Sequence, residues 1–128
     1  MGIPEFDESE WPILRVIFDV SLTPEEVDEY LARCAEMLAR RERMALLIDA
    51  RKAEIPDAKT RARFVDFFET QRPRTRRYIA GMAVVLQTAM GRGVVTAITW
   101  IESPTFPVKS FEHASEARMW LKDLLGAH

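Results

Sequence analysis

The chain has 128 residues, of which 48% are hydrophobic and 30% are charged, and its formal net charge is −2. This length and balance predict a soluble globular domain with a sizeable core, and they give no overall reason to bind nucleic acid or an acidic membrane. The single cysteine, Cys34, excludes an internal disulfide framework and a cysteine-based zinc site.

Residues 1–10 are acidic and include Pro4, a composition that predicts neither a signal peptide nor a transit peptide. We expect a flexible acidic tail over residues 1–10, followed by a single domain over residues 11–128. No apolar run approaches the roughly 20 residues that span a bilayer, so the sequence predicts no membrane span. A single cysteine fits a reducing compartment, and we expect a cytoplasmic protein.

The first strand is expected from Pro12 to Val20, a segment rich in Val, Ile and Phe. A helix start follows. Thr23 can accept from free backbone N–H groups, Pro24 suits the first helical position, and Glu26 completes a capping box. Apolar residues at steps of three and four then form one helical stripe: Val27, Tyr30, Leu31, Cys34 and Leu38.

The middle of the chain predicts two buried strands around a second helix. Met44–Ile48 is almost wholly apolar, which is typical of a strand covered on both faces, and Asp49 follows it directly. Asp57 can cap the second helix, and Pro73 disturbs that helix near its end. The third strand is expected over Tyr78–Leu86.

The segment over residues 88–101 has the composition of a strand but the apolar period of a helix. We interpret it as a helix, because parallel strands on either side need a crossover there. Phe106–Phe111 predicts a short edge strand, since Pro107 cannot donate to a sheet. The last helix is expected to begin near His113.

Strands that alternate with helices of this length predict parallel pairing with right-handed crossovers. The expected fold is therefore α/β, with a four-to-five-stranded mainly parallel sheet and about four helices.

Three segments resemble the STAS superfamily, in its SpoIIAA-like, lipid-binding-protein-like branch. They are Leu46–Arg51 (LLIDAR), Arg77–Val85 (RYIAGMAVV) and Phe111–Leu121 (FEHASEARMWL). The resemblance runs from about residue 11 to residue 125, and it implies a SpoIIAA-like fold and a non-enzymatic role.

The chain departs from the family's regulated anti-sigma antagonists at one position. Those proteins carry a phosphorylatable serine at the start of the helix after the second buried strand, as the resemblance implies. The corresponding segment here, residues 55–61, contains no serine, and its only hydroxyl belongs to Thr60. We therefore expect no phosphorylation switch.

Asp49 and Arg51 follow a central strand at its carboxyl end, where open parallel sheets usually bind ligands. They predict a polar pair at the mouth of a pocket, although Asp49 satisfying loop N–H groups and Arg51 packing over a helix end fit the pattern as well. Gly91, Arg92 and Gly93 form a second candidate, because glycines near a helix start let an anionic group approach the backbone. Close packing is the alternative explanation for those glycines.

Aromatic residues cover more than one side of the second helix, at Phe64, Phe67 and Phe68. A helix that covers a sheet needs only one apolar stripe, so the surplus indicates a homodimer surface or the lid of an apolar pocket, or else a deeply buried helix. The run Arg72–Arg77 carries four arginines. It could meet an anionic headgroup, nucleic acid or an acidic partner, and solvated arginines at a helix end are the simpler interpretation.

The sequence offers no nucleophile elbow, no phosphate loop and no metal-ligand cluster, so we predict no catalytic residue, no metal and no cofactor. The predicted function is a non-enzymatic STAS-like module that mediates protein–protein interaction or self-association. The alternative is a carrier of a small, lipid-like ligand that is apolar or anionic, with a pocket near the carboxyl ends of the central strands. Arg51 or Arg92 would then pair with an anionic end of that ligand.

Overall fold

A computed structural model describes residues 3–18, 22–52, 57–88 and 104–126. Within these residues the strands are β1 (Glu5–Glu10), β2 (Ile13–Ile17), β3 (Met44–Asp49), β4 (Ile79–Val85) and β5 (Val108–Phe111). The helices in the same ranges are α1 (Pro24–Ala39), α2 (Ala58–Thr70), α3 (Arg72–Tyr78) and α5 (Ala114–Gly126).

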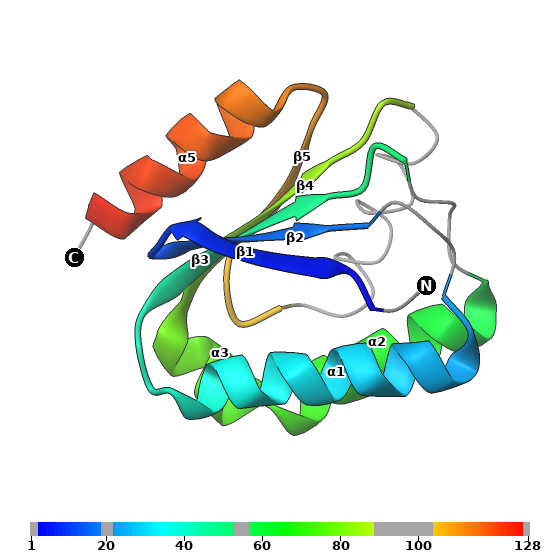
Figure 1. Ribbon diagram of the computed structural model, residues 1–128. Coiled ribbons are helices and arrows are strands. Elements are labelled where there is room, and N and C mark those ends of the chain that lie inside the picture. Colours follow the sequence, from blue (N-terminus) through cyan, green and yellow to red (C-terminus); the bar gives the residue numbers. More distant parts are fainter. Residues whose placement is uncertain (1–2, 19–21, 53–56, 89–103, 127–128) are drawn as a thin grey trace.

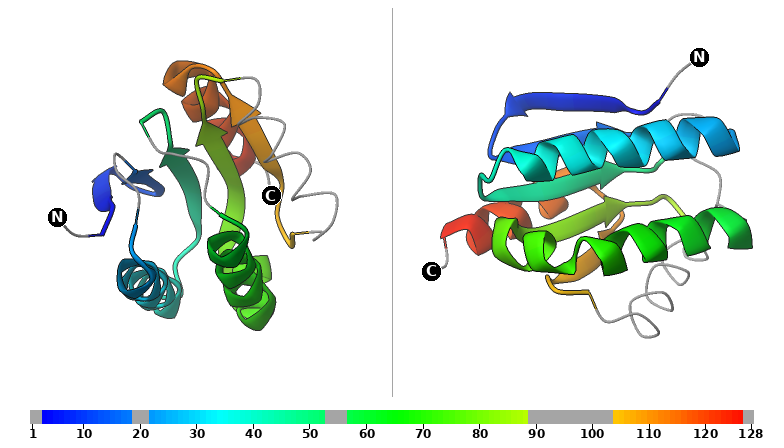
Figure 2. Two further views of the ribbon diagram at one scale, coloured as in Figure 1. Left: turned by 90° about the vertical axis from the view of Figure 1, so that its right-hand side faces the viewer. Right: turned by 90° about the horizontal axis from the view of Figure 1, so that it is seen from below.

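The strands form one sheet in the order β1-β2-β3-β4-β5 (Figure 1). β1 pairs with β2 in antiparallel orientation, and the pairs from β2 to β5 are parallel. α1, α2 and α3 cover one face of the sheet, whereas α5 covers the other (Figure 2). This arrangement confirms the predicted α/β class with a mainly parallel sheet, and β5 is an edge strand as expected.

Side-chain caps begin helices α1 and α2, the two long helices on one face of the sheet. In α1 the Thr23 hydroxyl accepts from the Glu26 backbone N–H at 3.2 Å, and the Glu26 carboxylate accepts from the Thr23 N–H at 2.9 Å. In α2 the Asp57 carboxylate accepts from the Thr60 N–H at 2.8 Å. Both predicted caps are confirmed. Pro73 lies near the start of α3, where a missing N–H is tolerated.

The structure differs from the prediction of a flexible acidic tail over residues 1–10, because residues 5–10 form strand β1. Phe6 pairs in register with Val16 and faces the interior, while Glu5, Glu8 and Ser9 are exposed. An edge strand needs few apolar residues, and charged side chains along it discourage pairing with other chains. The acidic composition therefore concealed a strand.

Most of the predicted helix over residues 88–101 lies outside the described residues, as do Gly91, Arg92 and Gly93. None of the helices that the structure describes has the length and the apolar character to cross a membrane.

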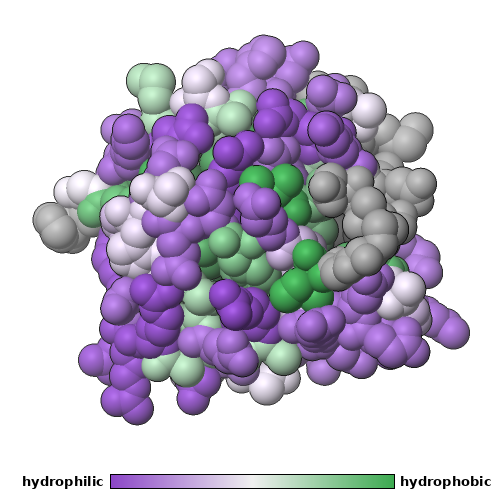
Figure 3. Space-filling model, viewed as in Figure 1, coloured by the Kyte–Doolittle hydropathy of each residue, from purple (hydrophilic) through white to green (hydrophobic). Residues whose placement is uncertain are grey.

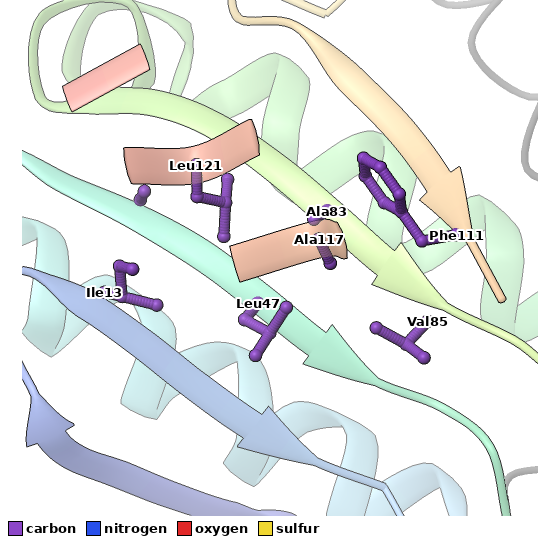
Figure 4. Packing of buried hydrophobic residues seen from close by; sticks show 8 residues of the cluster. Ile13, Leu47, Ala83, Val85, Phe111, Ala117 and Leu121 are labelled. Atoms are coloured by element: carbon purple, nitrogen blue, oxygen red, sulfur yellow. The ribbon is translucent and has the colours of Figure 1, made fainter. Parts of the chain in front are cut away.

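The face of the sheet under α5 is closely packed. Ala45, Leu47, Ala83 and Val85 are each 0% exposed, and they pack with Ala117 and Leu121 of α5 (Figure 4). A Cβ atom added at Gly81 would run into the end of the Leu124 side chain, so glycine at this position lets α5 come close to β4. Small residues on both elements bring the helix near the strands.

The opposite face of the same strands is packed less completely. Leu46, Ile48 and Met82 alternate with the fully buried residues and point toward α1 and α2, yet all three remain partly exposed. Successive side chains of a strand point to opposite faces. The same strands therefore have fully buried side chains on the α5 face and partly exposed side chains on the face toward α1 and α2.

Replacing Leu47 by alanine should cost about 3 kcal/mol of unfolding free energy, because its contacts in the packed face are complete. Leu46→Ala should cost at least about 1 kcal/mol less, since that side chain already lacks neighbours on one side. Urea denaturation of both variants compares the two faces directly. Equal losses would contradict the asymmetry.

Candidate functional site

A cavity of about 280 Å³ lies between the sheet and the layer formed by α1, α2 and α3. The sheet contributes the floor, α1 and α2 contribute two walls, and most of the lining side chains are apolar. On the face of the molecule seen in Figure 3, apolar side chains gather in the middle and are framed by hydrophilic residues. The partly exposed floor residues from β3 and β4 include Leu46, Ile48, Met82 and Val84.

The three phenylalanines of α2 line this cavity. Phe64, Phe67 and Phe68 are all half-buried and pack with the residues of the helix-covered face of the sheet. Of the interpretations that the sequence left open, the wall of an apolar pocket therefore agrees with their placement. A homodimer surface that includes their exposed parts stays a prediction.

Tyr30 of α1 connects the aromatic side chains at one end of the cavity. Its ring centroid lies 5.7 Å from that of Phe6, 5.1 Å from that of Phe18 and 6.0 Å from that of Phe64. These rings come from β1, the end of β2 and α2, and they meet at tilted or edge-on angles, which aromatic pairs prefer. A second group joins Phe67, Phe68 and Phe106.

Few polar groups reach the cavity. The Thr75 and Thr105 hydroxyls lie 2.7 Å apart, and Thr75 also donates to the Arg72 carbonyl at 3.2 Å. Thr75 is 1% exposed, so this pair is a buried polar point in apolar surroundings. Arg61, Glu69 and Arg72 also border the cavity. Such a wall suits a molecule that is apolar over most of its surface and has at most a small polar end.

Cys34 also borders the cavity, next to Tyr30. Burial raises the pKa of the Cys34 thiol to about 11 and raises the pKa of Tyr30 well above its ordinary value. Because the thiolate is the nucleophile, the protonated Cys34 behaves as an apolar wall residue at neutral pH. In the described part of the chain, no group of three or more His, Cys, Asp or Glu side chains is placed to hold a metal ion.

Asp49 lies on the opposite face of the sheet from the cavity. It shares the side of β3 that carries Ala45 and Leu47, and it is 5% exposed. Arg51 donates to its carboxylate through Nε at 2.9 Å and through Nη2 at 2.7 Å, and Arg15 donates through Nη2 at 3.0 Å. The structure thus separates Asp49 from the phenylalanines of α2, although the sequence placed them around one pocket.

The Arg51 side chain, followed by Arg15, holds the pKa of the Asp49 carboxyl at about 2. The two guanidinium groups offset the negative charge of the buried carboxylate, and their hydrogen bonds hold the carboxyl end of β3 in position. The Asp49 carboxylate also accepts from the Arg51 backbone N–H at 3.3 Å, which agrees with the part of the structural interpretation that has Asp49 satisfying a loop N–H group. The Arg51 side chain pairs with Asp49.

A family model described as SpoIIAA-like matches residues 13–122. The chain belongs to the SpoIIAA-like family. This result confirms the resemblance to the STAS superfamily that the three sequence segments carried. No curated protein matches the chain.

One solved structure similar to this SpoIIAA-like chain is that of an uncharacterized protein from the DUF3478 family of Shewanella loihica PV-4, which has a SpoIIAA-like fold. The two are 16% identical, the match covers 94% of each chain, and the TM-score is 0.72. At this level of identity the likeness shows the fold alone.

Sequence reasoning on this SpoIIAA-like chain missed Phe6, Phe18 and Thr75 as cavity residues. Phe6 lies within the acidic segment over residues 1–10, and Thr75 lies within an arginine run where nothing marks it as buried. One signal could have located Phe6, because it is an apolar residue among acidic ones and such isolated apolar residues occur on the inward side of edge strands. The sequence around Thr75 contains no comparable signal.

The Asp49 cluster should make stability depend on acid pH. The pKa of the Asp49 carboxyl is about 2 in the folded protein, below the ordinary 3.8. The contribution of the ionised carboxylate to the unfolding free energy is therefore complete above pH 4 and is lost as the pH falls toward 2. The difference in unfolding free energy between the unmodified chain and Asp49→Asn should shrink by about 2 kcal/mol between pH 5 and pH 2. Urea titrations across that range measure it. A difference that does not vary with pH would contradict the cluster's role.

Proposed function

We propose that this SpoIIAA-like domain binds a small apolar molecule in the cavity between the sheet and helices α1 and α2. The observation that carries the proposal is the contrast along β3. Leu47 is 0% exposed, whereas its neighbours Leu46 and Ile48 stay partly exposed on the side of the cavity. A bound molecule would complete the packing of the cavity side of the sheet, as α5 already completes the packing of the other side.

The energetics favour an occupant. Removing apolar surface from water contributes about 25 cal/mol per Å², and the floor residues Leu46, Ile48 and Met82 of the cavity are still partly exposed. The volume also falls near the lower end of the range for small-molecule pockets, which supports a ligand of modest size.

The lining favours binding over chemistry. The thiol at the wall, Cys34, has its pKa raised to about 11, and the hydroxyls of Thr75 and Thr105 bond to one another. These groups can orient a ligand, and none of them is an activated nucleophile. The role we propose is that of a carrier or sensor.

The other predicted function, self-association through Phe64, Phe67 and Phe68, stays a prediction, because these half-buried residues line the cavity and are also partly exposed. A protein partner and a cytoplasmic location stay predictions.

Filling the cavity tests the proposal. We expect the uncharged fluorophore N-phenyl-1-naphthylamine to bind the unmodified chain with a rise in fluorescence and in melting temperature, since a ligand of the folded state stabilises it. Leu46→Trp places an indole in the space beside β3 and should weaken that binding more than about tenfold, which corresponds to about 1.4 kcal/mol. Circular dichroism should show the same fold.

Met119→Trp is the matched control, because Met119 is 68% exposed on α5, on the other side of the sheet. This variant should bind the fluorophore as the unmodified chain does. Undiminished binding to Leu46→Trp would sink the proposal, and so would equal weakening in both variants.

A further inference from the structure

A second concave surface lies outside the cavity. It is formed where α1 leads into β3 and α3 leads into β4, and these two connections lie at the same end of the molecule (Figure 1). We call it the basic hollow. Its lining residues are Ala39, Arg41, Pro73, Arg74, Arg77 and Tyr78. None of them lines the apolar cavity. The arginine run of the sequence thus meets Arg41, a residue more than 30 positions earlier.

The hollow carries positive charge, and no carboxylate lies among its lining residues. Its lining includes three exposed arginines. In the described part of the chain, no ion pair joins Arg41, Arg74 or Arg77 to a carboxylate. Two neighbouring arginines do have carboxylate partners. Arg40 pairs with Glu8 and Glu42, and Arg72 pairs with Glu69. The three guanidiniums are therefore available to an external anion.

Helix stability does not explain Arg74. It lies in the first turn of α3, where the helix dipole favours anions and disfavours cations. Arg77, in the last turn, does complement the dipole, and its guanidinium lies 5.7 Å from the Tyr78 ring centroid. Arg74 and Arg77 are three positions apart, so both project from one side of the helix.

Arg41 has an unfavourable backbone conformation. Its φ is 58°, and within the described ranges it is the only residue other than glycine with a positive φ. It directly follows Arg40, the C-cap of α1, at the position where helices usually place glycine. A large side chain there costs stability, which points to a use for its charge.

We propose that the basic hollow binds a phosphate group, presented by a soluble phosphate compound or by a phospholipid headgroup. Guanidinium groups hold phosphate oxygens through paired N–H bonds, and Arg41, Arg74 and Arg77 surround one concavity from two segments. The site is separate from the apolar cavity, so it does not depend on the function proposed above.

Arg41→Gly separates binding from folding. Glycine suits a φ of 58°, so the variant should melt at the same or a higher temperature. It should bind pyrophosphate more than about tenfold more weakly than the unmodified chain in calorimetry at low salt, where exposed charges are least screened. Arg74→Gln, which leaves that backbone unchanged, should show a similar loss. Lys122→Gln on α5 changes the net charge equally and should bind as the unmodified chain does.

A second arm identifies the source of the phosphate. The same variants are sedimented with phosphatidylcholine vesicles, with and without phosphatidic acid. Pyrophosphate binding supports a soluble ligand, and binding only to vesicles with phosphatidic acid supports a headgroup. The proposal is overturned if neither probe binds, or if Arg41→Gly and Arg74→Gln bind as tightly as Lys122→Gln. Fluorophore binding in the cavity should be unchanged in all three variants.

Discussion

The alternation of side chains along β3 and β4 is the constraint on which the rest of the molecule depends. Each of these central strands has a neighbour on both edges and a helix layer on both faces, so every residue must belong to one layer or the other. Leu47 and Ala83 meet α5, whereas Leu46 and Met82 meet the cavity. Adjacent residues of one strand therefore pack into two different layers, one of which is tightly packed and the other incompletely filled.

The sizes of the residues explain why the two layers differ. The α5 side uses Ala45, Gly81, Ala83 and Ala117, which let a helix backbone come close to the sheet. The other side uses aromatic rings from several elements, which pack around Tyr30 at tilted or edge-on angles. These rings line the cavity on that side of the sheet.

Charged groups then tie the periphery to this frame. Arg118 of α5 binds the Glu10 carboxylate at 2.5 and 2.9 Å, which joins the helix to the end of β1. Arg40 joins α1 to the same strand through Glu8 at 2.6 Å and lies over the Trp11 ring. The buried Asp49 cluster fixes the end of β3. Against these paired groups, the arginines of the basic hollow stand out as a distinct feature.

The sequence by itself determined the fold class, both helix caps and the family, because apolar period and capping chemistry are local properties that tertiary contacts did not override. It also singled out Phe64, Phe67 and Phe68, but not the direction in which their rings point. Only the tertiary structure placed Asp49 on the face opposite the cavity, since that depends on the register of a whole strand. Only the tertiary structure could bring Arg41 to Arg74 or find a strand in residues 5–10, because both depend on partners that are distant along the chain.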